Sequence, residues 1–144
     1  MKLLDANILL YAYNSSSQEH RQAQRWLEGA FAEPDPIGLC WLTIGAFLRI
    51  STNGRIFQQP LQTSQATRIV SKWLSHPSVI LLAPGDRYWT ILSRLVVESQ
   101  CRGPLIFDAS LAALALEHGA VLCTTDKDFT RFSELRTLNP LADA

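Results

Sequence analysis

Apolar residues along the chain fall into two kinds of run, some with the spacing of one helical face and some continuous. In residues 18–31, for example, Ala23, Trp26, Leu27 and Ala30 recur on a single helical face. The same spacing, bounded by capping residues and by helix-breaking prolines and glycines, predicts helices at 8–13, 18–31, 43–50, 64–75, beyond 86 and at 109–117.

The continuous apolar runs are short and lie between the predicted helices. They predict strands at 2–4, 37–41, 79–82 and 121–124, of which 37–41 is expected to be buried and 79–82 is apolar throughout. Strands that alternate with helices form a parallel sheet. We therefore predict an α/β fold in three layers, with a central parallel sheet and helices on both faces.

Length and composition favour one compact unit. The chain has 144 residues, of which 47% are hydrophobic, and we expect a single domain over 1–144. No run approaches the roughly 20 apolar residues of a membrane helix, and no signal peptide is recognisable, so we expect a cytoplasmic protein that does not bind membranes. The cysteines, Cys40, Cys101 and Cys123, lack metal-ligand spacing and are expected to be reduced core thiols.

The charges balance overall but are unevenly distributed. The formal net charge is zero, yet residues 36–85 contain no acid, while Arg49, Arg55, Arg68 and Lys72 lie in this stretch. Such a segment could form a positive rim for a phosphodiester beside an acidic centre. An ordinary solvated surface on two helices explains the same residues, and the charges alone favour that interpretation.

Tryptophan is the other residue type that bears on a nucleic-acid ligand. The chain has four, at Trp26, Trp41, Trp73 and Trp89. Each could stack on a base. Because most of them lie on apolar helical or strand faces, we expect them in the core or at a dimer interface.

Aspartates stand at three junctions between an apolar run and a predicted helix or turn. Asp5 follows the first strand, Asp108 opens the helix at 109–117, and Asp126 follows the strand at 121–124. Ligands of parallel α/β sheets bind beyond the carboxyl ends of the strands, so carboxylates from opposite ends of the chain would meet there. Converging carboxylates repel one another, and Mg²⁺ or Mn²⁺ would neutralise them and support phosphodiester hydrolysis.

Each of these residues has a simpler explanation when taken alone. Asp is among the commonest helix N-caps. Asn7 is a turn residue, or it orients a carboxylate or substrate two positions after Asp5, and Asp128 lies two positions after Asp126. The coincidence of three aspartates at the predicted sheet edge favours a metal site over three independent caps.

Four segments, in order, resemble the PIN-domain ribonucleases, and among these most closely the VapC toxins. They are LDANILLY at 4–11, the segment 41–52 with its final FLRIST, FDA at 107–109 and TDKDF at 125–129. The resemblance spans nearly the whole chain, including NPL at 139–141. Any one segment would be weak, but four in the right order are specific.

The resemblance implies a PIN-like fold, Mg²⁺ or Mn²⁺ at the acidic cluster and cleavage of RNA. It also implies a homodimer and a VapB-type antitoxin that inserts a segment over the active site. Asp5, Asp108 and Asp126 match the metal-binding acids of the family and are therefore the catalytic and metal-binding candidates. The candidates for substrate binding are Asn7, Arg49 and Asp128.

One position departs from the pattern of the family. PIN ribonucleases commonly carry a glutamate just before the FLR segment, where this chain has Gly45 and Ala46. The loss of a carboxylate is expected to weaken metal affinity, particularly for a second ion. The alternative function is therefore a catalytically weakened PIN relative that binds RNA or antitoxin. A phosphotransfer enzyme of another doubly wound class is disfavoured, because the acid patterns of those enzymes are missing.

Overall fold

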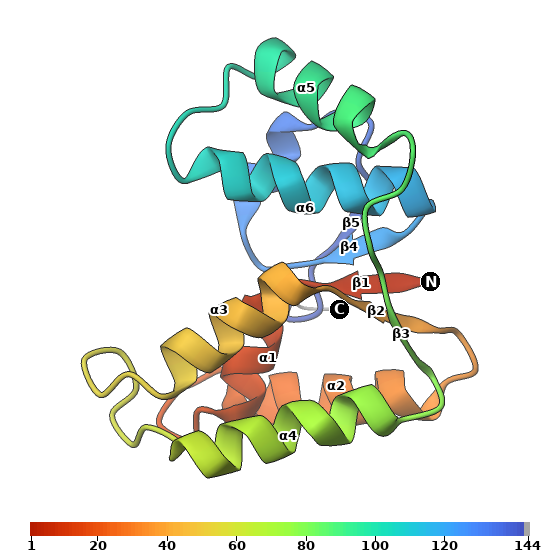
Figure 1. The fold of residues 1–144 in the computed structure, drawn as a ribbon. Coiled ribbons are helices and arrows are strands. Elements are labelled where there is room, and N and C mark those ends of the chain that lie inside the picture. The colour runs from red at the N-terminus through yellow and green to blue at the C-terminus, as the bar shows by residue number, and fades with distance from the viewer. Residues whose placement is uncertain (143–144) are drawn as a thin grey trace.

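The computed structural model describes residues 1–142, and Figure 1 shows their arrangement. In chain order the elements are β1 (Lys2–Leu4), α1 (Ala6–Tyr13), α2 (His20–Ala32), β2 (Ile37–Leu39), α3 (Trp41–Ser51), α4 (Thr63–Ser75), β3 (Val79–Leu81), α5 (Tyr88–Glu98), α6 (Leu105–His118), β4 (Val121–Cys123), the 3₁₀ helix η1 (Lys127–Arg131) and β5 (Thr137–Leu138). Within this part of the chain no helix is both long and apolar enough to cross a bilayer.

The strands form one parallel sheet in the order β3-β2-β1-β4-β5. From β1 the chain builds β2 and β3 on one side, then crosses to build β4 and β5 on the other. The order therefore reverses between β1 and β4, which is where ligands bind in open parallel sheets. The predicted α/β fold with a central parallel sheet is confirmed.

Helices cover both faces of the sheet, as Figure 1 shows: α1 to α4 lie on one side, and α5 and α6 on the other. Alternation along β1 explains this division. Leu3 packs into the core beneath α5, α6 and η1, whereas the adjacent Leu4 packs into the core formed with α1 to α4. Leu122 and Cys123 divide in the same way on β4. The paired strands β1 and β4 therefore each contribute side chains to both cores.

Two expectations about elements are wrong. The strand expected at 37–41 ends at Leu39, because α3 already begins at Trp41. The residues before Asp108 do not lead into a helix that this aspartate caps, because α6 already begins at Leu105 and Asp108 lies in its first turn. Pro104, with its fixed φ, occupies the N-cap position instead.

Candidate active site

The acidic residues lie at the carboxyl ends of β1 and β4. Asp5 directly follows β1, and its backbone N–H donates to the carbonyl of Cys123, at 3.0 Å, so the two strand ends are joined at this point. Asp126 lies three residues beyond β4 and is the N-cap residue of η1. Residues separated by most of the chain therefore meet because β1 and β4 are neighbours.

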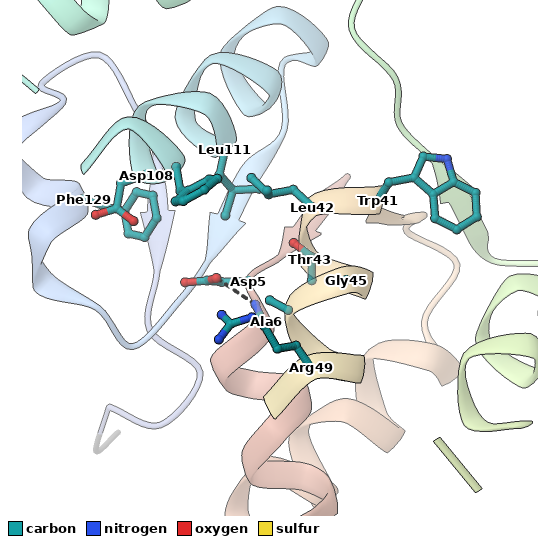
Figure 2. Close-up of a pocket in the computed structure, with 12 residues that line it drawn as sticks. Asp5, Ala6, Trp41, Leu42, Thr43, Gly45, Arg49, Asp108, Leu111 and Phe129 are labelled. Atoms are coloured by element: carbon teal, nitrogen blue, oxygen red, sulfur yellow. Dashed lines mark hydrogen bonds between the residues drawn. The ribbon is translucent and has the colours of Figure 1, made fainter. Parts of the chain in front are cut away.

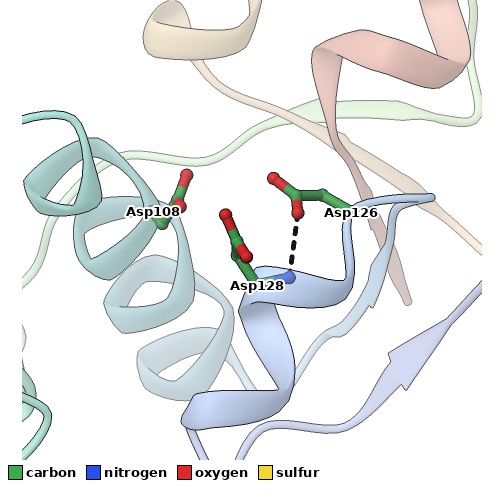
Figure 3. Close-up of side chains that lie close together, drawn as sticks. All are labelled: Asp108, Asp126 and Asp128. Atoms are coloured by element: carbon green, nitrogen blue, oxygen red, sulfur yellow. Dashed lines mark hydrogen bonds between the residues drawn. The ribbon is translucent and has the colours of Figure 1, made fainter.

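Three carboxylates gather on the α6 side of this edge. One oxygen from each of Asp108, Asp126 and Asp128 lies within 4.8 Å of the other two (Figure 3). The backbone N–H of Asp128 donates to Asp126 Oδ1 at 2.8 Å, and this capping bond of η1 turns Asp128 back toward Asp126. Asp128, which sequence reasoning assigned to substrate binding, thus lies within the acidic cluster itself.

Asp5 lies beside this cluster rather than within it. Its side chain accepts hydrogen bonds from the backbone N–H of Ala6 and from Thr124 Oγ1, both at 2.7 Å. Asp5 is therefore a cap of α1, as the simpler explanation held, and it also lines the same cleft as Asp108 (Figure 2). Asp5 therefore caps α1 and lines the candidate site at the same time.

Thr124 connects the two strand ends and was missed by sequence reasoning. Its buried Oγ1 donates to Asp5 Oδ2 and accepts from the backbone N–H of Asp126, at 3.0 Å. The side-chain amide of Asn7 points to the same hydroxyl, at 3.4 Å. The only signal in the sequence is a hydroxyl residue directly after a strand and two positions before an aspartate. Through this one hydroxyl, the orientation of Asp5 is tied to the backbone of Asp126.

The carboxylates destabilise one another in their charged forms. Burial raises the pKa of Asp108 to about 6, with further increases from Asp126, Asp5 and Asp128 and an opposing effect of the Arg131 guanidinium. Burial also raises the pKa of Asp5, although its hydrogen bonds from Thr124 and Ala6 oppose the increase. The site therefore has more negative charge than its own cations neutralise, a condition that a bound divalent cation relieves.

A cleft of about 480 Å³ opens beside these acids. Asp5 and Asp108 lie on one wall, and α3 provides the other with Trp41, Gly45, Ala46 and Arg49; Figure 2 shows the Arg49 side chain next to Ala6, near Asp5. Ala46 lies where the resemblance placed a glutamate in other PIN proteins. The residues of α3 that line the cleft therefore include the cation of Arg49, the ring of Trp41 and small residues, but no acid.

The family model for the PIN domain matches residues 2–135. The chain belongs to the PIN-domain family. Among curated relatives it is 41% identical over 142 residues to ribonuclease VapC37 of Mycobacterium tuberculosis, covering 99% of each chain. It is 36% identical over 140 residues to ribonuclease VapC31 of the same species, covering 97% of this chain and 99% of the relative. This PIN domain is therefore of the VapC ribonuclease kind.

Solved structures with the same fold are more distant in sequence. VapBC-1 from nontypeable Haemophilus influenzae aligns with a TM-score of 0.70 at 20% identity, over 98% of each chain. Mycobacterium tuberculosis VapC20, described as a sarcin-ricin loop cleaving toxin, aligns with a TM-score of 0.68 at 17% identity, over 94% of this chain and 99% of that one. At these identities the likeness concerns the fold.

The donor set of this PIN domain suits a small, hard cation. Asp108, Asp126 and Asp128 offer only carboxylate oxygens, which Mg²⁺ and Mn²⁺ prefer, and they are spaced closely enough to share one ion. Burial and, to a lesser extent, the neighbouring carboxylates raise the pKa of Asp108, so its charged form would be stabilised by a cation here. The cysteines are not part of this donor set, because Cys40, Cys101 and Cys123 are all buried in the two cores.

Proposed function

We propose that this protein is a metal-dependent endoribonuclease that acts as the toxin of a toxin-antitoxin pair. The observation that carries the proposal is the cluster of Asp108, Asp126 and Asp128 at the switch point of the sheet, with Asp5 beside it. The VapC ribonucleases among its relatives support RNA as the substrate. We expect the chain to act as a single domain over 1–144.

The residues of the site have separate roles in this proposal. Asp108, Asp126 and Asp128 would hold Mg²⁺ or Mn²⁺, and Asp5 would be a further acid on the same cleft. When bound, such an ion supplies Lewis-acid stabilisation of the charge that develops on a phosphodiester. Arg49 binds a phosphate oxygen from the opposite wall of the cleft.

Asn7 has a positioning role. Its amide nitrogen faces Thr124 Oγ1, and its buried Oδ1 has no hydrogen-bond partner among the described residues. That oxygen is closed to solvent, and Asn7 does not line the cleft, so the residue does not contact the substrate directly. Asn7 instead supports the Thr124 hydroxyl that orients Asp5 and the backbone of Asp126.

The partners follow from the same relatives. Several solved structures with this fold are VapBC complexes, in which the toxin is joined to its antitoxin. We expect a VapB-type antitoxin and a homodimer for this chain as well. A second candidate function, a weakly catalytic PIN protein that acts by binding RNA or antitoxin, is favoured by one observation, the presence of Ala46 on the wall where a glutamate is common.

The test is RNA cleavage by the purified chain, freed of antitoxin, with Mg²⁺ or Mn²⁺ and with a chelator. Asp126→Asn should lower the cleavage rate by at least about a hundredfold, because it removes a charged ligand while retaining an oxygen for the capping bond of Asp128. Asp86→Asn, at an exposed position outside the cleft, is the matched control and should cleave at the wild-type rate.

Each alternative has its own signature in this assay. Cleavage that persists in chelator, or that survives Asp126→Asn, contradicts a metal site at this cluster. If folded wild-type protein cleaves no RNA with either metal, the binding function replaces the proposed one.

A further inference from the structure

Two aromatic side chains on the walls of the cleft are largely exposed to solvent. Trp41, the first residue of α3, is 61% exposed, and Phe107, in the first turn of α6, is 62% exposed. Both line the cleft that contains Asp5 and Asp108. Within residues 1–142, neither ring pairs with another aromatic ring. Exposed apolar surface gathered in a concave site is typical of a ligand-binding surface.

The two rings lie at different distances from the acids. Phe107 directly precedes Asp108 on α6, whereas Trp41 lies at the end of the cleft away from Asp5 (Figure 2). A second cleft of about 200 Å³ shares Trp41, Leu42 and Leu111 with the first, so the groove continues past Trp41. This geometry suits an extended ligand that passes the acids rather than a small molecule held beside them.

The charge of the α3 wall matches a polyanion. The stretch 36–85, which contains α3, has no acid, and the guanidinium of Arg49 forms no ion pair among the described residues. Each nucleotide of RNA offers both a phosphate for such a cation and a flat base for an exposed ring. The observations on the two walls therefore point to one ligand class.

We propose that Phe107 and Trp41 are base-stacking residues, which hold unpaired RNA nucleotides on the two walls and so position a phosphodiester over the acids. The faces of bases within a duplex are covered by neighbouring bases, so the two rings select unpaired segments. This inference rests on the proposed function, because it takes RNA as the substrate. It adds to that function the residues that decide which nucleotides enter the cleft.

The test measures binding and cleavage separately. Labelled oligoadenylate is titrated by fluorescence anisotropy with Asp126→Asn protein, which reports binding whether or not the wild type cleaves RNA. In this background, Phe107→Leu and Trp41→Leu remove a ring but keep an apolar side chain. Each should weaken binding by about five- to a hundredfold, the contribution of one stacked base. Trp89→Leu, which removes a 71% exposed ring on α5 outside the cleft, should leave the dissociation constant unchanged.

A second oligonucleotide tests whether the loss of stacking causes the weaker binding of the leucine variants. An oligonucleotide of the same length that carries abasic sites lacks the flat partners of the rings, so Phe107→Leu should change its affinity little. Tyrosine at 107 should restore binding of oligoadenylate because it keeps a π face. The parent and Phe107→Leu proteins, each with the intact and the abasic oligonucleotide, form a double-mutant cycle in which the loss of ring and the loss of base are not additive.

Two results would contradict base stacking by these rings. If both leucine variants bind oligoadenylate within about twofold of the parent protein, or if ring and base losses add independently, the proposal is overturned. Failure of the proposed function looks different: the wild type then cleaves no RNA with metal, while the ring variants still weaken binding. Thermal unfolding of each variant shows that it is folded, as expected for substitutions at exposed positions.

Discussion

The two walls of the cleft are built in opposite ways. On the acidic side, Asp5 and Asp126 are held by hydrogen bonds to Thr124, and Asp126 in turn accepts from the backbone of Asp128. On the α3 side, the exposed side chains of Trp41 and Arg49 lie beside small residues. The acidic wall is charged, and hydrogen bonds orient its side chains, whereas the large side chains of the α3 wall are exposed to solvent.

This difference separates two tasks. Ion binding needs donors held within a narrow range of distances, and the hydrogen bonds of Thr124 and Asp128 provide that order. Recognition of a flexible strand tolerates more freedom, because stacking and phosphate contacts accept many sequences. We therefore expect substitutions on the acidic wall to affect turnover, and substitutions on the α3 wall to affect affinity.

The largest effect should come from disrupting the order of the acidic wall. Thr124→Val keeps the shape of the side chain but removes the hydroxyl that donates to Asp5 and accepts from the N–H of Asp126. We expect turnover to fall by about ten- to a hundredfold and the free energy of unfolding to fall by about 1–3 kcal/mol. Cleavage at saturating metal and thermal unfolding measure the two effects.

Thr124→Ser is the matched control for this prediction. Serine keeps the hydroxyl and should recover most of the turnover, although it loses a buried methyl group. If valine and serine reduce turnover equally, the hydroxyl is not the feature that orients the acids, and the order of this wall has another source.

The general arrangement of this site could be predicted from the sequence. Strand-helix alternation predicts the parallel sheet, and a parallel sheet places residues that follow its strands at one edge, which explains why Asp5 and Asp126 meet. The sequence could not show how closely each carboxylate approaches. Asp128 joins the cluster because η1 turns the chain back, and a short 3₁₀ helix leaves little pattern in a sequence.

Exposure is the other feature that periodicity does not decide. Trp41 was expected in the core or at a dimer interface; the structure excludes the core, because α3 begins at this residue and Trp41 lies on the cleft wall, 61% exposed in the single chain. The run 79–82 is apolar throughout, yet β3 is an edge strand and Ile80 is 45% exposed. Apolar character alone does not indicate which side of an element another element covers.

The difference between the two walls can be reduced by adding a carboxylate to the α3 wall. Ala46→Glu adds to the α3 wall the acid that other PIN ribonucleases carry there, opposite Asp5 and Asp108. We expect Mn²⁺ to bind about tenfold more tightly, because an added carboxylate increases the charge and number of ligands. Calorimetric titration of Mn²⁺ measures the dissociation constant, and cleavage at limiting Mn²⁺ should increase in parallel.

Gly45→Ala controls for the change made to α3. An added Cβ at Gly45 meets nothing within 4 Å, so this variant should stabilise the helix by about 0.5–1 kcal/mol without changing Mn²⁺ affinity. If Ala46→Glu binds Mn²⁺ no more tightly than Gly45→Ala does, the α3 wall is too far from the ion to contribute a ligand.

The smallest expected effect is on the free energy of unfolding without metal, which the charged form of Asp108 lowers. Because the pKa of Asp108 in the folded protein is raised to about 6 from 3.8, its charged form destabilises the fold. The cost is absent below about pH 4, where the group is protonated in both states, and is complete above about pH 6. In chelator at pH 8, Asp108→Asn should therefore raise the free energy of unfolding by on the order of 1 kcal/mol, after allowance for solvent screening of this half-buried group.

Thermal unfolding at pH 8 and pH 4 tests this sign. The stabilisation by Asp108→Asn should disappear at pH 4, and Asp86→Asn should show no such pH-dependent difference from the wild type. Added Mn²⁺ should reverse the order at pH 8, because the wild type then gains binding energy that the asparagine variant has lost. Wild-type protein that is more stable than Asp108→Asn at pH 8 in chelator would show that the acidic wall is already neutralised by its own cations, with Arg131 the first candidate.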